Sequence, residues 1–226
     1  MARSLILWLI WLAFILYVLL LAPPVQADTL QPLQTLLAGQ LPSINPVMGA
    51  LFSLVGIWLL IYSGLIFADG RMQRWPAWMF MVGAIAMGVL ALIPYLALRQ
   101  PNQSFVGEKD AWLEFLDSRR TGVVLTLSTV LLGVWAIGWG DWAGFAQEFM
   151  TNKFVHGMSI AVVLFTLLFP YPTLLQDDMA RRGLVSNSQL FAIAAWVPLL
   201  GPLVYLCLRP ALLATRSSNS NFAHLQ

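Results

Sequence analysis

The chain has 226 residues, of which 59% are hydrophobic and only 10% are charged, and its mean hydropathy is +0.77. Soluble domains carry about 25% charged residues, so lipid must be the solvent for much of this apolar surface. The formal net charge of +2 is too small to indicate a nucleic-acid-binding protein. The single cysteine, Cys207, excludes an intramolecular disulfide and any cysteine-rich metal site.

Six apolar runs predict an all-α, polytopic transmembrane bundle that forms a single domain over residues 1–210. As helices, these runs approach the ~30 Å thickness of the hydrocarbon core. Residues 211–226 are polar and predict a disordered tail. The predicted spans are 5–22, 47–67, 77–98, 123–139, 154–175 and 190–208.

The first run has two interpretations. Arg3, the apolar stretch and the small-residue sequence 25–27 together resemble a cleaved signal peptide. However, the run is longer than the roughly 7–15 apolar residues of a signal peptide. We therefore favour a retained span, and an intact mass beginning at Asp28 would contradict this.

Prolines predict how several spans begin and bend. Pro46, after Asn45, is expected to begin the second span. Pro94 should kink the third span, and Pro170 and Pro172 should break the fifth.

The longest polar loop, 99–122, contains a predicted short helix. Over 110–116, Trp112, Phe115 and Leu116 share one side of that helix, as in a segment lying at the membrane interface. A plain helical turn in solvent explains the pattern equally well.

The positive-inside rule does not decide the orientation of six spans. With the N-terminus in the cytoplasm, six basic residues fall inside and six outside. Arg3 and the absence of Lys and Arg from loop 23–46 favour a cytoplasmic N-terminus.

An internal duplication would explain this balance. Tyr95 to Arg99 and Tyr205 to Arg209 both read Tyr-Leu-x-Leu-Arg, and each follows a loop that contains Asp and two Arg. A duplication of three spans places its halves in opposite orientations, as a 3+3 inverted repeat. Alternatively, the motif is simply a helix that ends at the interface, where Tyr and Arg are both favoured.

The predicted spans carry little that indicates chemistry. No Asp, Glu, Lys or Arg lies near the middle of a span, which argues against an ion-coupled pump. His156 is the only histidine near the membrane, so a haem with two histidine ligands has no second ligand. An axial ligand to a pigment or haem and a polar residue at the interface both stay open for His156.

The densest charge lies in 177–183. As a helix, this segment pairs Asp177 with Arg181 and Asp178 with Arg182, at the favourable i,i+4 spacing, and Gly183 suits the helix end. Exposed pairs of this kind contribute only ~0.3–0.5 kcal/mol each. The favoured interpretation is a helix-end ion-pair cluster or a surface on which a partner docks, and a divalent-cation or headgroup site is the less favoured alternative. The candidate interaction cluster is Asp177, Asp178, Arg181, Arg182, Asp69 and Arg71.

The segments 92–99, 116–122, 177–183 and 200–210 resemble an integral-membrane family of cyanobacteria, with similar proteins in plastids, to which no activity is assigned. The likeness extends from about residue 5 to 210. It implies a thylakoid or plasma membrane and a retained first span, and it transfers no catalytic residue.

Three functions are compatible with the sequence. A non-enzymatic factor that assembles or stabilises a membrane complex is favoured, because no phosphate-binding loop, nucleophile elbow or zinc motif is found. The alternatives are a transporter of small solutes or lipids and an enzyme that modifies lipids or isoprenoids through Asp177 and Asp178. We predict no catalytic residue, cofactor, metal or nucleic-acid partner; the expected partners are the bilayer and other membrane proteins.

Overall fold

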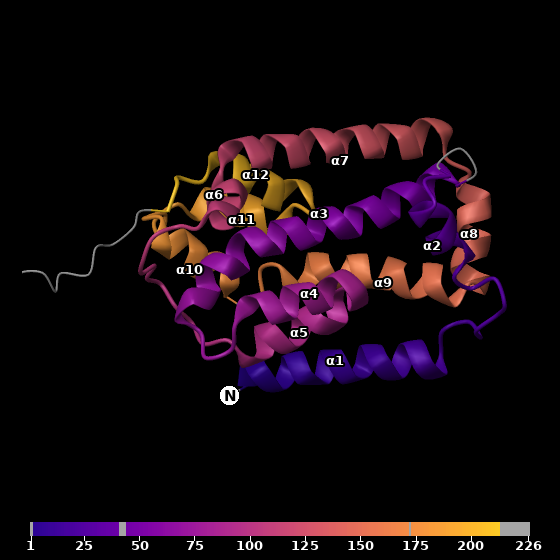
Figure 1. Ribbon diagram of the computed structural model, residues 1–226, viewed down its shortest axis with the longest axis horizontal. Helices are drawn as coiled ribbons and strands as arrows, with labels where there is room; N and C mark the ends of the chain where they lie inside the picture. The colour runs from indigo at the N-terminus through magenta and orange to yellow at the C-terminus, as the bar shows by residue number, and fades with distance from the viewer. Residues whose placement is uncertain (1, 41–43, 172, 213–226) are drawn as a thin grey trace, which may run out of the picture.

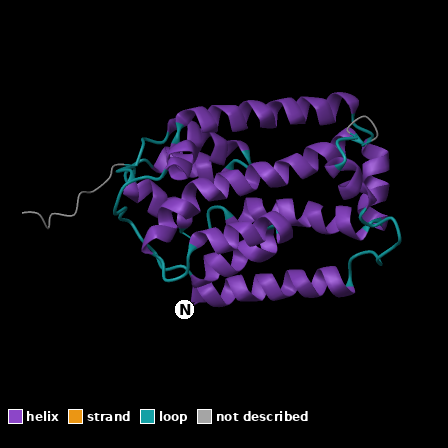
Figure 2. Ribbon diagram, in the orientation of Figure 1, coloured by secondary structure: helices purple, strands orange, loops and turns teal. Residues whose placement is uncertain are grey.

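The computed structural model is helical throughout, which confirms the predicted all-α class (Figures 1 and 2). It describes residues 2–40, 44–171 and 173–212, so nearly all of the predicted disordered tail lies outside the described residues. No strand occurs within these ranges. The helices are α1 (Ala2–Leu20), α2 (Gln31–Leu37), α3 (Pro46–Asp69), the 3-10 helix η2 (Gly70–Met72), α4 (Ala77–Met87), α5 (Val89–Leu98), α6 (Ala111–Asp117), α7 (Arg119–Trp139), α8 (Trp142–Thr151), α9 (Lys153–Leu168), α10 (Leu174–Arg181), α11 (Ser188–Trp196) and α12 (Leu200–Leu208).

Three helical segments are long and apolar enough to cross a membrane: α1, Pro46–Met72 and α7. The pair α8 and α9 meets the same criterion only when taken together, and the two helices are bent by 103°. The described residues thus contain three candidate spans, or four with the bent pair. The six predicted spans are not confirmed.

The proline predictions are correct for the start of α3 and for a break after α9, whereas Pro172 lies outside the described residues. The Asn45 side chain accepts a hydrogen bond from Val47 N, and Pro46 opens α3 as predicted. The fifth predicted span ends early, because α9 stops at Leu168 and α10 begins only after Thr173, whose φ is +60°.

Predicted span 77–98 is instead two short helices that fold against each other. The backbone reverses at Gly88, where φ is +58°, a conformation that glycine adopts without a steric penalty. A Cβ on Gly83 of α4 would lie 3.1 Å from the Cβ of Ala91 on α5. Because α4 starts beside Gly70 and α5 ends beside Asp69, the pair returns to the side on which it entered.

Predicted span 190–208 has the same form. The chain turns between α11 and α12 at Pro198 and Leu199, and Leu199 has a φ of +59°. A Cβ on Gly201 would collide with the backbone carbonyl of Ile193, so only glycine permits this close contact. Helices of nine to eleven residues extend about 14–17 Å, roughly half of the hydrocarbon thickness.

The ends of the long helices lie together at the two ends of the bundle. α1 and α7 begin at the end where α3 and α9 finish, and both short-helix pairs open toward that end (Figure 1). At the opposite end, the N-terminal cap Asn45 of α3 exchanges hydrogen bonds with the backbone of Asp141, just beyond α7. There, too, Tyr17 of α1 bonds to His156 of α9.

The centre of the core is an aromatic contact between α3 and α9. Trp58 stacks on Phe165 with ring centroids 6.3 Å apart, and Tyr62 meets Phe169 edge-on at 5.7 Å. All four side chains are almost fully buried. The Tyr62 hydroxyl donates to the backbone carbonyl of Phe165, which satisfies one polar group inside this apolar contact.

The predicted short helix over 110–116 is α6. Trp112 and Phe115 are about half exposed and stack on each other, whereas Leu116 is buried. The expectation that Leu116 shares their outward face is therefore wrong, since Leu113 and Leu116 form the inward face of α6.

Candidate functional site: a buried ion-pair cluster

Four aspartates and four arginines meet at the end of the bundle where α3, α5, α10 and α12 finish. Their side chains, together with those of two tyrosines, are no more than 9% exposed. We call this set the cluster and this end of the molecule the cluster end. The cluster consists of Asp69, Tyr95, Arg99, Asp117, Asp177, Asp178, Arg181, Arg182, Tyr205 and Arg209.

The first part of the cluster joins α3 to α5. Oδ2 of Asp69 accepts hydrogen bonds from the Tyr95 hydroxyl at 2.7 Å and from Arg99 Nε at 3.0 Å. Its Oδ1 accepts from Arg99 Nη2 at 2.7 Å. This bidentate contact is the strongest geometry for an arginine–carboxylate pair.

The second part repeats this arrangement between α10 and α12. Oδ2 of Asp178 accepts from the Tyr205 hydroxyl at 2.6 Å and from Arg209 Nη1 at 3.3 Å. The same oxygen accepts from Arg182 Nε at 2.9 Å. Each hairpin thus ends in a Tyr and an Arg that bind one buried aspartate.

Two further ion pairs connect these parts. Nη2 of Arg99 donates to Asp177 Oδ2 at 2.6 Å, and Nη1 of Arg181 donates to Asp69 Oδ1 at 3.2 Å. Both bonds join the first hairpin and α3 to α10. Because a buried charge left without its partner costs several kcal/mol, these reciprocal pairs hold the two halves of the chain together.

Asp117 at the end of α6 brings the long loop into the cluster. Its carboxylate pairs with Arg182 Nη1 at 2.6 Å and with Lys109 Nζ at 3.0 Å, and it accepts from Leu212 N at 3.0 Å. Nη2 of Arg209 donates to the carbonyl of Leu116 at 2.9 Å.

Local sequence explains where α10 ends. Gly183, with φ +72°, lies just past the end of α10, and Leu184 N bonds to the carbonyl of Met179. This Schellman ending stops the helix directly after its two arginines, as the glycine predicted.

Nearby positive charges keep the Asp178 carboxylate ionised. Burial alone would raise the pKa of the Asp178 carboxyl, but the guanidinium groups of Arg182, Arg209 and Arg181 outweigh burial and hold that pKa well below its usual range. The cations are not fully satisfied, because Nε and Nη2 of Arg181 and Nε of Arg209 are buried without a hydrogen-bond partner.

The sequence-based prediction for residues 177–183 is correct in part. Asp178 and Arg182 pair at i,i+4 as expected, whereas Asp177 and Arg181 each bind a residue outside α10. Asp69 belongs to the same cluster, but Arg71 does not: it forms an exposed pair with Asp110 at 2.7 Å. The pairs in 177–182 are buried, not at the surface as predicted.

Sequence reasoning missed the tyrosines, Asp117 and the two hairpin arginines as members of the cluster. The repeated Tyr-Leu-x-Leu-Arg motif contained the signal for four of them, because its Tyr and Arg supply the two groups that bind Asp69 and Asp178. The alternative interpretation, a helix that ends at the membrane interface, does not predict this contact, because the Tyr and Arg of both motifs are buried in the protein.

His156 is held by protein groups on both ring nitrogens. Nδ1 lies 2.8 Å from the carbonyl of Phe149 and therefore donates to it, which leaves Nε2 to accept from the Tyr17 hydroxyl at 2.7 Å when the ring is neutral. The ring also stacks on Phe149. This geometry gives His156 a role in packing α1 and α8 against α9.

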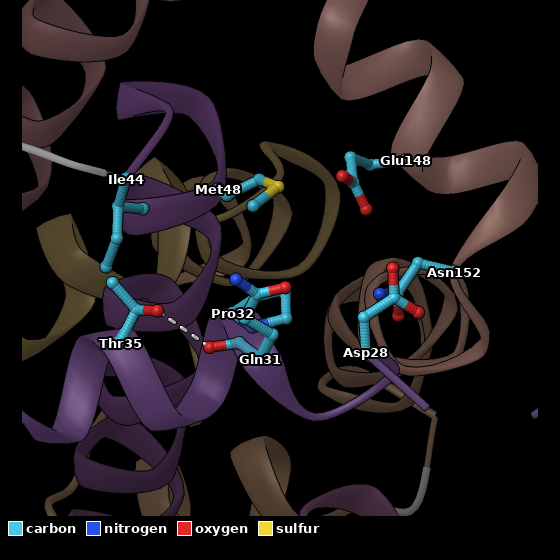
Figure 3. A pocket seen from close by; sticks show the side chains of 8 residues that line it. All are labelled: Asp28, Gln31, Pro32, Thr35, Ile44, Met48, Glu148 and Asn152. Carbon is cyan, nitrogen blue, oxygen red and sulfur yellow. Dashed lines mark hydrogen bonds between the residues drawn. The ribbon is translucent and has the colours of Figure 1, made fainter. Parts of the chain in front are cut away.

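A small acidic recess lies at the opposite end of the bundle (Figure 3). It has a volume of about 200 Å³ and is lined by residues near α2, the start of α3 and the bend between α8 and α9. Asp28 and Glu148 supply its two carboxylates, and Thr35 donates to the carbonyl of Gln31 within its wall. The remaining lining residues are Pro32, Ile44, Met48 and Asn152.

The cluster is suited to holding helices together. Each of its four carboxylates already binds at least one guanidinium group, which leaves none as an open base or cation ligand. Within the described ranges, no group of three or more His, Cys, Asp or Glu side chains is arranged to hold a metal ion.

Comparison with protein-family models, with curated proteins and with solved structures finds no match to this chain. The resemblance to a membrane family of cyanobacteria and plastids therefore stays a prediction.

Proposed function

We propose that the chain is an integral membrane protein with four crossings and two half-depth hairpins. α1, α3, α7 and the bent α8–α9 pair cross the membrane, while α4–α5 and α11–α12 enter and leave at the cluster end. The exposed leucines and valines of α1 and α7 support this, because such faces suit lipid. This arrangement replaces the six spans expected from the apolar runs.

We further propose that the chain is a duplication whose halves run parallel. Asp69, Tyr95 and Arg99 correspond to Asp178, Tyr205 and Arg209. The aromatic contact supports this, since Trp58 pairs with Phe165 and Tyr62 with Phe169 in the order expected around a two-fold axis. Two crossings per half preserve orientation, so the predicted inverted repeat becomes a parallel one.

The function we propose is a non-enzymatic factor that assembles or stabilises a membrane complex. One observation carries this proposal: the polar groups most suited to chemistry are buried and paired with each other. They fix the shape of a bundle whose outward helices are apolar. We expect this complex in a thylakoid or plasma membrane of a photosynthetic organism, as the resemblance stated above implies.

Native co-purification with photo-crosslinking tests this function. A crosslinking residue at Ile85 on α4 or at Ile137 on α7 probes two outward faces that are 77% and 76% exposed. We expect a defined protein adduct from at least one position, retained with the tagged full chain in mild detergent. Lipid adducts alone from both positions, with a single protein species, would refute an assembly role.

A transporter of small solutes or lipids is the second candidate. The half-depth hairpins and the proposed duplication favour it, because repeated halves with broken helices are common in transporters. In that case, breaking the inter-half pair with Arg181→Met would raise solute flux into proteoliposomes above that of the unchanged chain. A lipid- or isoprenoid-modifying enzyme is disfavoured, since Asp177 and Asp178 are occupied by arginines.

A further inference from the structure

The basic residues of the described chain are concentrated at one end. Ten of them lie at the cluster end, and one, Lys153, lies at the opposite end, where α9 begins. In the sequence-based prediction, the basic residues are divided equally between the two sides of the membrane, because each hairpin is counted as one crossing. Once α5 returns to the side on which α4 began, six basic residues move to the cluster end and Lys153 moves away from it. The six are Arg99, Lys109, Arg119, Arg120, Arg181 and Arg182. The ten are Arg3, Arg71, Arg74, Arg99, Lys109, Arg119, Arg120, Arg181, Arg182 and Arg209.

Acidic residues do not cancel this asymmetry. The cluster end carries seven Asp and Glu residues against ten basic ones, whereas the opposite end carries three acids against Lys153. The difference is three positive charges at one end and two negative charges at the other. The acids at the opposite end are Asp28, Asp141 and Glu148.

We propose that the cluster end faces the cytoplasm and that Arg74, Arg119 and Arg120 bind anionic phospholipid headgroups of the inner leaflet. Short cytoplasmic segments of membrane proteins carry an excess of Lys and Arg, which is the observed asymmetry. The proposal rests on the membrane insertion stated above and adds a direction and a lipid class to it.

The length of α7 places its arginines at headgroup depth. Arg119 and Arg120 are exposed at its first turn, and Trp139 is 70% exposed at its last residue. The 21 residues of α7 extend about 31 Å, close to the hydrocarbon thickness. Val124 and Leu131, between these ends, are more than half exposed. A helix that begins with two arginines and ends with tryptophan thus marks both membrane boundaries.

Arg74 lies at the base of the first hairpin, at the cluster end. It is exposed between η2 and α4, and its guanidinium lies 6.0 Å from the ring of Trp75. Trp75 and Trp78 are about half exposed, and tryptophan is enriched at the membrane–water interface. Arg74, Arg119 and Arg120 form no ion pair within the described residues, unlike Arg71, which binds Asp110. Their charges are therefore free to bind phosphate groups.

Cysteine labelling in intact cells tests the direction. In a full chain with Cys207→Ser, single cysteines are introduced as Ser104→Cys at the cluster end and Gln147→Cys on α8, both at exposed positions. A membrane-impermeant maleimide should label Gln147→Cys in intact cells and Ser104→Cys only after permeabilisation. The reverse pattern in a carbonate-resistant protein would overturn the orientation alone, whereas release by alkaline carbonate would also overturn the proposed insertion.

Lipid binding in neutral detergent tests the headgroup sites. Each cation at an anionic surface contributes roughly fivefold in affinity, so R74Q/R119Q/R120Q should weaken binding of phosphatidylglycerol by at least tenfold and by no more than roughly a hundredfold. Binding of phosphatidylcholine with the same acyl chains should not change. Lys153→Gln, at the opposite end, is the matched control and should leave both affinities unchanged. Equal phosphatidylglycerol binding by the triple variant and the unchanged chain would overturn the proposal.

Discussion

Replacing Asp69 with asparagine removes the charge that joins both halves of the cluster. The carboxylate accepts four hydrogen bonds, one from Tyr95, two from Arg99 and one from Arg181. Asparagine is nearly isosteric but presents an NH₂ group to these donors. Arg99 keeps its pair with Asp177, whereas Arg181 retains only a distant contact, with its Nε 4.0 Å from Asp178.

Breaking a buried ion pair by removing one partner costs about 3–5 kcal/mol. In a chain of this size each kcal/mol lowers Tm by about 2–4 °C, so Asp69→Asn should lower Tm by roughly 6–20 °C. Thermal unfolding of the purified full chain in mild detergent measures this shift. The double variant D69N/R181M should recover part of the loss, because it also removes the stranded cation, and the double-mutant cycle then gives a coupling energy of about 0.5–3 kcal/mol.

Asp110→Asn is the matched control. Asp110 also pairs with an arginine, Arg71, at 2.7 Å, but its side chain is 63% exposed. Asparagine preserves its cap on α6, and an exposed pair contributes only about 0–1 kcal/mol. If the Tm values of Asp69→Asn and Asp110→Asn both lie within about 2 °C of the Tm of the unchanged chain, the buried ion pairs of Asp69 do not stabilise the fold, which would contradict this prediction.

Three further predictions follow from the same geometry. Tyr95→Phe and Tyr205→Phe should each cost about 1.5–3 kcal/mol, because each removes an equivalent bond to a buried carboxylate; denaturant unfolding showing unequal costs would argue against equivalent halves. Gly122→Ala should lower Tm, since its Cβ would lie 2.9 Å from the backbone of α12, whereas Gly133→Ala in the same helix has open space and should be neutral or stabilising. The depressed pKa of Asp178 means that its carboxylate favours the folded state above its unfolded pKa of about 3.9 and loses this contribution as the pH falls further. The Tm gap between the unchanged chain and Asp178→Asn should therefore stay constant from about pH 8 to about pH 5 and narrow below about pH 4; a gap that narrows already near pH 6 would contradict the assignment.

The sequence predicted what depends on local chemistry. The apolar runs gave the helical class, Asn45 and Pro46 gave the start of α3, and Gly183 gave the end of α10. Each of these rests on a preference that acts within a few residues. The pair between Asp178 and Arg182 is likewise set by helical spacing alone.

What the sequence did not predict depends on reversals of the chain. An apolar run of about twenty residues is consistent with one crossing or with two half-depth helices, and composition does not separate them. Gly88 lies inside predicted span 77–98, but its positive φ ends α4. Leu199 adopts a positive φ that its residue type disfavours. Without these reversals, the six-span prediction placed Arg99 on the opposite side of the membrane from Asp69 and Arg209 on the opposite side from Asp178, so it did not reveal the cluster.

The hairpins also explain why 177–182 carries two carboxylates and two arginines. Asp178 and Arg182 pair with each other within α10, at the i,i+4 spacing of an ordinary helical ion pair. Asp177 and Arg181 instead reach the first half, where Arg99 and Asp69 receive them with opposite charge. One pair builds its own half and the other joins the halves. The second acid–arginine set of α10 therefore joins this helix to α3 and α5, and two buried donors of Arg181 have no hydrogen-bond partner.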